Sequence, residues 1–140
     1  MLMTIALGVY INMGAGINGA GTTYMGEKRA WLEEMGFAGV RQDIHWDPDV
    51  WTRAIEEFRG SRLTPIFVIH GATREQLVQE AYKVALAARV YSIKGYLEVT
   101  NEPNYRDDDW KWNPRGLAEA INEISLIPEV YCCYARESIK

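Results

Sequence analysis

Residues 64–78, TPIFVIHGATREQLV, contain the pattern on which most of the chain is built. The run Thr64–Ile69 is apolar on both parities, as expected of a strand that is covered on both faces. After a short loop, Thr73 to Gln76 match a capping box, in which side chains satisfy free N–H groups at a helix N-terminus. The stretch therefore predicts a β-strand, a loop and an amphipathic α-helix in succession.

This succession occurs four times along the chain. Strands are expected at Ile5–Ile11, Ala38–Ile44, Thr64–Ile69 and Gly95–Val99, with starts 33, 26 and 31 residues apart. The first helix is expected near residues 26–35, and the others follow caps at Asp47, Thr73 and Asn113. Strands that alternate with helices at this spacing predict an α/β fold with a parallel sheet.

Each expected helix has one apolar face, and its residues are the expected core. In chain order they are Trp31, Leu32 and Met35; Val50, Trp51, Ala54, Ile55 and Phe58; Leu77, Val78, Ala81, Val84, Ala85 and Ala88; and Leu117, Ala118, Ile121 and Ile124. We interpret Trp31 and Trp51 as packing residues. Pro128 interrupts the pattern, and residues 130–134 fit a short fifth strand, another helical turn or unrelated sequence.

Composition and charge exclude several classes of protein. A chain of 140 residues with 48% hydrophobic and 24% charged residues is typical of one globular domain. The net charge of −4 comes without a basic block, so we expect no nucleic-acid partner. No run of about 18 consecutive apolar residues is present, so we expect no membrane partner.

The cysteines and the N-terminal segment carry little information about compartment. Cys132 and Cys133 are adjacent, which predicts neither a disulfide framework nor a metal site. Residues 1–21 are apolar, but the first basic residue is Lys28, whereas a signal peptide begins with positive charge. We therefore interpret this segment as a first strand and its loop, and cytoplasm is the default expectation.

Polar and aromatic side chains follow the predicted strands, where parallel α/β folds hold their ligand sites. Strand by strand, these residues are Arg41, Asp43, His45 and Trp46; His70 and Gly71; and Asn101, Glu102, Pro103 and Asn104. The carboxyl ends of parallel strands meet at one edge of a sheet, so we expect these groups to converge there.

Residues 96–104, YLEVTNEPN, resemble the fourth-strand signature of clan A glycoside hydrolases, the (β/α)8-barrel cellulases, mannanases and β-xylosidases. Residues 39–46, GVRQDIHW, look like the second strand of that family, and residues 66–71, IFVIHG, look like its third. The phrasing Glu-Val-x-Asn-Glu-Pro-Asn is closest to the xylosidase- or iduronidase-like branch. Thr100 departs from the pattern, because tryptophan or glycine is more usual there.

The resemblance implies that residues 1–140 are a partial domain, the first four units of a (β/α)8 barrel, with residues 125–140 unassigned. It implies that Glu102 is the general acid/base, while Asn101 binds the sugar 2-OH and Arg41 orients carboxylates. His45 and His70 would donate to sugar hydroxyls, and Trp46 would stack on a sugar ring. The implied partner is a carbohydrate, and neither a cofactor nor a metal is expected.

Simpler interpretations and one missing group stand beside these assignments. Arg41 could pair with Asp43 or Glu98 inside the sheet, and His45 could serve a cap or loop. Retaining hydrolysis needs a second carboxyl about 5–5.5 Å from the first. The family's nucleophile ends the seventh strand and has no counterpart here. We therefore expect either the acid/base half of a glycosidase, or a non-catalytic half-barrel that binds carbohydrate or pairs with a second chain or copy.

Overall fold

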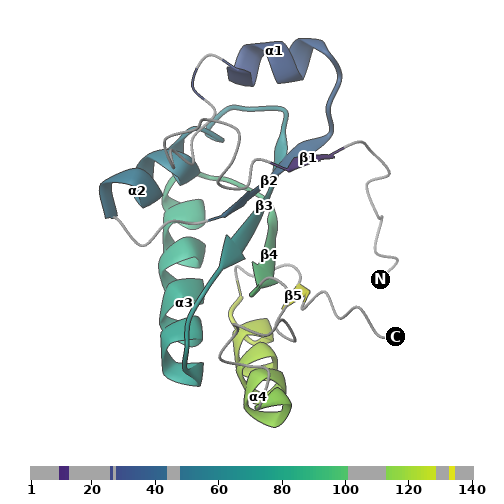
Figure 1. The fold of residues 1–140 in the computed structure, drawn as a ribbon. Helices are drawn as coiled ribbons and strands as arrows, with labels where there is room; N and C mark the ends of the chain where they lie inside the picture. The colour runs from purple at the N-terminus through teal and green to yellow at the C-terminus, as the bar shows by residue number, and fades with distance from the viewer. Residues whose placement is uncertain are drawn as a thin grey trace, which may run out of the picture.

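The computed structural model of the chain describes residues 10–12, 26, 28–43, 48–100, 113–128 and 133–134. Its elements are β1 (Tyr10–Asn12), α1 (Lys28–Glu34), β2 (Gly39–Asp43), α2 (Pro48–Glu56), β3 (Thr64–Ile69), α3 (Arg74–Val90), β4 (Tyr96–Val99), α4 (Pro114–Ser125) and β5 (Cys133–Tyr134) (Figure 1). Strands and helices alternate, so the predicted α/β class is confirmed. Of the first predicted strand, residues 5–9 lie outside the described residues. Of the alternatives for residues 130–134, the structure has a short strand at Cys133–Tyr134, and residues 130–132 lie outside the described residues.

The five strands form one parallel sheet in the order β1-β2-β3-β4-β5, so each strand pairs with the next strand along the chain. The three central strands are in register, with Arg41 beside Ile66 and Val68 beside Glu98. The outer strands are shorter, three residues in β1 and two in β5. The regular part of the sheet is therefore β2, β3 and β4.

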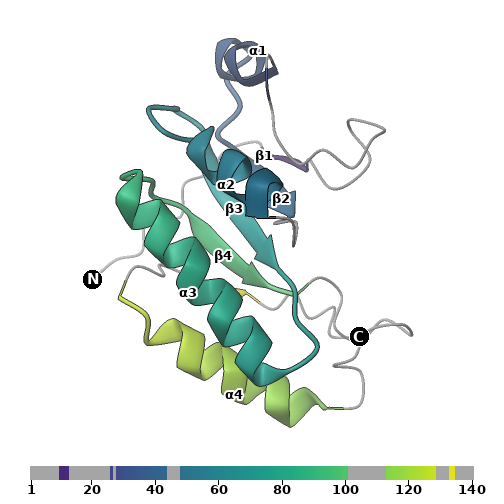
Figure 2. The same ribbon diagram turned by 90° about the vertical axis from the view of Figure 1, so that its left-hand side faces the viewer.

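The core lies between the sheet and its helices. Val40, Phe67, Leu97 and Val99 are buried and join residues of all four helices in one hydrophobic cluster. Figure 2 shows α2, α3 and α4 on the same side of the sheet. Alternate residues of the strands point to the opposite face, where Val68 is nevertheless fully buried. Ile66 on the same face is half-buried, so the prediction of burial on both faces is confirmed at the carboxyl-terminal part of β3, although the described helices cover one face.

The predicted helix caps are confirmed where the structure describes them. The Thr73 hydroxyl accepts from the Gln76 N–H at 3.2 Å, and the Asn113 side chain accepts from the Gly116 N–H at 3.0 Å. The Gln76 side chain accepts from the N–H of Ala72, one residue before the cap. The capping box is therefore formed with a shifted partner, while Asp47 lies outside the described residues.

Some predicted core positions are wrong. Trp31 and Met35 are 55% and 56% exposed, because α1 is only seven residues long and buries one side chain, Leu32. In α4, Ala120 is buried and Ala118 is exposed, and in α3 Ala87 is more deeply buried than Ala88. Each of these helices turns a slightly different face to the sheet than the sequence spacing indicated. The structure does not describe the side chains of Val50 and Trp51.

Gln42 is a polar residue inside the core. Its side chain is fully buried, and neither its amide nitrogen nor its oxygen has a hydrogen-bond partner in the described part of the chain. An unsatisfied buried amide costs about 1–3 kcal/mol, so we expect Gln42→Met to raise the free energy of unfolding by about 1–2 kcal/mol. Urea denaturation measures the difference. Gln79→Met, on the exposed face of α3, is the matched control, and an equal gain in both variants would contradict the explanation.

Candidate functional site

The carboxyl ends of β2, β3 and β4 form the edge of the sheet at which the predicted site lies. The Thr100 N–H donates to the Ile69 carbonyl at 2.9 Å, which continues the β3–β4 ladder by one bond. The chain therefore leaves the sheet after Ile69 and after Thr100 at the same level. His70 follows the first of these points, and the Asn-Glu-Pro triplet follows the second.

The structure describes two of the six predicted site residues. Arg41 lies in β2 and His70 directly follows β3. Asn101, Glu102, His45 and Trp46 lie outside the described residues, so their positions stay predictions.

Arg41 and Glu98 form an ion pair across the middle of the sheet. Arg41 Nε lies 2.7 Å from Glu98 Oε2, and Arg41 Nη2 lies 2.7 Å from Glu98 Oε1. The side chains are 17% and 8% exposed. Their strands are separated by β3, so the pair spans that strand. Val40 and Leu97, their neighbours in the strands, belong to the hydrophobic cluster with the helices, so by strand alternation the pair lies on the other face of the sheet. Bidentate pairing of this kind fixes orientation as well as charge.

This pair confirms the simpler interpretation of Arg41, which pairs with a carboxylate inside the sheet, while its role in orienting the site stays a prediction. Glu98 is one of the two sheet partners considered, and the side chain of the other, Asp43, lies outside what the structure describes. Both Glu98 oxygens accept hydrogen bonds from Arg41, so the carboxylate is held in one orientation by the guanidinium. Arg41 is held by the protein and is a fixed positive group near the site edge. The polar residue within the apolar β4 run was the sequence signal for this pairing.

His70 is exposed at the end of β3, at the site edge. It is followed by Gly71, where an added Cβ would lie 2.9 Å from the Leu77 backbone nitrogen and 3.0 Å from Gln76 Cβ. Glycine therefore allows the loop after β3 to pass close to the first turn of α3. This close approach fixes the path of the loop that presents His70.

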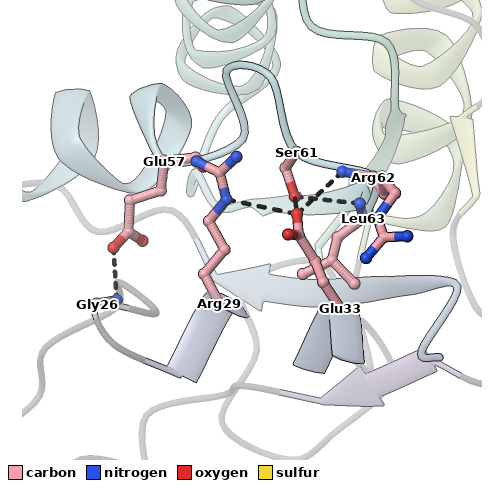
Figure 3. Close-up of polar contacts among 7 residues, drawn as sticks. All are labelled: Gly26, Arg29, Glu33, Glu57, Ser61, Arg62 and Leu63. Atoms are coloured by element: carbon pink, nitrogen blue, oxygen red, sulfur yellow. Dashed lines mark hydrogen bonds and ion pairs between the residues drawn. The ribbon is translucent and has the colours of Figure 1, made fainter. Parts of the chain in front are cut away.

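A second polar cluster lies at the opposite end of the strands, between α1 and the turn before β3 (Figure 3). Glu33 Oε1 accepts from the Ser61 hydroxyl at 2.6 Å and from the Arg62 N–H at 3.0 Å. Arg29 lies 3.5 Å from the same oxygen and donates to the Glu57 carbonyl at 2.8 Å. Residues at the amino ends of the strands in βα folds serve stability rather than chemistry. The cluster therefore fastens α1 to the α2–β3 connection.

The Glu33 cluster predicts a stability change in acid. The Ser61 hydroxyl and then the Arg62 N–H lower the pKa of Glu33 below the usual range of glutamate, and Arg29 adds to this. Because the folded-state pKa is depressed, this stabilisation is present above about pH 4.3, the usual glutamate pKa, and is lost as the pH falls through the lower folded value. We expect the free energy of unfolding of wild type to exceed that of Glu33→Gln at pH 7, and we expect the two values to converge near pH 3. A difference that does not change with pH would exclude this role.

In the described residues no group of three or more His, Cys, Asp or Glu side chains is placed to hold a metal ion. None of the described helices is long and apolar enough to cross a bilayer. No protein-family model, curated protein or solved structure matches the chain.

Proposed function

We propose that the chain is a glycoside hydrolase-like domain that acts on O-glycosidic bonds of an oligo- or polysaccharide. Glu102 is its acid/base carboxyl. The observation that carries the proposal is the position of the Asn101-Glu102-Pro103 triplet, which directly follows the fourth strand of a sequentially ordered parallel sheet. In the family that the sequence resembles, this triplet also ends the fourth strand.

The arrangement of the sheet supports a barrel-type fold for this proposal. Doubly wound α/β sheets reverse their strand order and carry helices on both faces. Here the order is sequential through all five strands, and α2, α3 and α4 lie on one side (Figure 2). That combination is typical of consecutive units of a (β/α)8 barrel, whose ligands bind at the carboxyl ends of the strands.

The proposed roles follow from the chemistry of glycoside cleavage. Glu102 gives its proton to the glycosidic oxygen as the bond to the sugar C1 breaks, and Asn101 binds the 2-OH, a contact that strengthens in the transition state. Glu98 is bonded to Arg41, and the resemblance assigns the role of proton donor to Glu102. Exposed His70 donates to a sugar hydroxyl, with His45 in a similar role and Trp46 stacking on the ring.

The 140-residue chain should bind oligosaccharide and hydrolyse it negligibly, because the resemblance assigns none of its residues to the family's second carboxylate. Isothermal titration with xylo-, cello- and manno-oligosaccharides tests binding, which we expect in the millimolar range, about −4 kcal/mol. Aryl β-xylosides, β-glucosides and β-mannosides test hydrolysis. Measurable turnover by the purified chain in plain buffer would overturn the expected inactivity.

The missing carboxylate can be replaced by a small anion to test Glu102 itself. Azide attacks C1, the glycosidic C–O bond breaks, and Glu102 protonates the leaving oxygen, so a glycosyl azide and a shortened sugar form. We expect slow azide-dependent release from an unactivated disaccharide that Glu102→Gln abolishes and Glu119→Gln, a change on α4, leaves intact. Binding without azide-dependent release would favour the non-catalytic, carbohydrate-binding half-barrel. Absence of both would reject the proposed function.

A further inference from the structure

Thr100 has two unusual properties at once. Its backbone φ is +61°, in the left-handed region, although threonine is branched at Cβ. Its side chain is 2% exposed, and the buried hydroxyl has no hydrogen-bond partner within the described residues. The residue is the last one described before Asn101 and Glu102.

Both properties are unfavourable for folding. Cβ-branched residues rarely adopt positive φ, because the side chain crowds the backbone. A buried hydroxyl without a partner has given up its bonds to water. Glycine would adopt the same φ without strain, as it does at Gly36 and Gly60. Unfavourable conformations of this kind persist where the surrounding structure enforces them, and they cluster at functional sites.

We infer that Thr100 is a positioning residue for the acid/base segment. Its left-handed conformation turns the chain out of β4 directly after the bond to Ile69. Its buried, branched side chain anchors that turn, which a glycine would leave free to rotate. The direction in which the chain leaves β4 at Thr100 is thereby fixed. The sugar-binding part of this inference rests on the proposed function, whereas its conformational part does not.

Three substitutions at Thr100 separate the contributions of backbone conformation, side-chain packing and the hydroxyl group. Thr100→Gly permits the φ value and removes the anchor, Thr100→Ala removes the anchor and keeps the strain, and Thr100→Val keeps shape and strain while removing the hydroxyl. In an ordinary strand glycine is less stable than alanine. Here we expect Thr100→Gly to melt at a higher temperature than Thr100→Ala, and Thr100→Val at least as high as wild type.

The positioning role is measured by backbone ¹⁵N relaxation at Asn101 and Glu102. We expect order parameters to fall from about 0.85 toward 0.6 in Thr100→Gly and to stay unchanged in Thr100→Val. Oligosaccharide affinity should fall about tenfold in Thr100→Gly and change little in Thr100→Val, because preorganisation is lost only in the first. A change in the order parameters or in oligosaccharide affinity would not simply report a loss of stability, because we do not expect Thr100→Gly and Thr100→Val both to be destabilised.

The outcomes separate the two proposals. If wild type binds no oligosaccharide but the order parameters change as expected, the proposed function fails and the positioning role stands. Equal order parameters in wild type and Thr100→Gly would overturn the positioning role, whatever the sugar affinity. A lower melting temperature for Thr100→Gly than for Thr100→Ala would overturn the assigned backbone conformation on which it depends.

Discussion

Removing either partner of the Arg41–Glu98 pair is expected to lower the free energy of unfolding by about 3–5 kcal/mol. Both side chains are mostly buried, and both Glu98 oxygens are bonded to the guanidinium. Arg41→Ala removes the guanidinium that donates to both oxygens of the buried Glu98 carboxylate, and Glu98→Ala removes the carboxylate that accepts both of these bonds. The large loss comes from the uncompensated charge rather than from the attraction alone.

A double variant distinguishes these two contributions. Arg41→Met combined with Glu98→Leu removes both charges and keeps apolar volume, so we expect it within about 1 kcal/mol of wild type. Arg115→Ala is the control, because the Arg115–Glu119 pair is on the surface, with Arg115 91% exposed, and such pairs contribute about 0–0.5 kcal/mol. Urea denaturation of all four variants gives the values. Single-variant losses below about 1 kcal/mol would contradict a structural role for the pair.

Gly95→Ala is expected to destabilise the chain by about 3 kcal/mol, because overpacking against backbone has little room to relax. An added Cβ would lie 2.5 Å from Pro65 Cγ and 2.6 Å from the Pro65 carbonyl oxygen. Pro65 is the second residue of β3 and Gly95 immediately precedes β4, so the clash falls where these two paired strands begin. Relief requires the strands to separate, which weakens their ladder.

Gly60→Ala provides the comparison for this substitution. Gly60 has φ +67° and no atom within 4 Å of an added Cβ, so alanine there meets strain without a clash and should cost about 1 kcal/mol. Thermal or urea denaturation ranks the two variants. Equal losses at both positions would mean that the contact with Pro65 is relieved by a small shift, and the explanation would then be wrong.

Much of the fold could be predicted from sequence periodicity. β3 has the predicted bounds, and all four helices lie where their caps and apolar spacing placed them. Exposure of Trp31 could not be predicted, because it depends on how little of the short helix α1 reaches the sheet. Periodicity shows that a helix has an apolar face, whereas tertiary packing decides which part of that face is buried.

The candidate site could be predicted only in part. The polar residue in β4 indicated Glu98 as a possible partner of Arg41, and the structure confirms that pairing. The conformation of Thr100 could not be predicted, since a threonine before asparagine carries no signal for a positive φ. The burial of Gln42 without a described hydrogen-bond partner could not be predicted either. The presence of an amide in a strand sequence does not show whether its side chain will find partners.

Sequential strand order also has a consequence for the folding pathway. Among the described strands, every neighbouring pair joins residues about 25–36 positions apart, and none of these pairings requires a longer loop to close. Loop-closure entropy rises slowly with length, so the four pairing steps have similar entropic costs. We therefore expect folding to begin wherever side-chain contacts are strongest, at β2–β3–β4, and to extend outward one unit at a time. Hydrogen exchange should accordingly be slowest in β3 and fastest in the short outer strands.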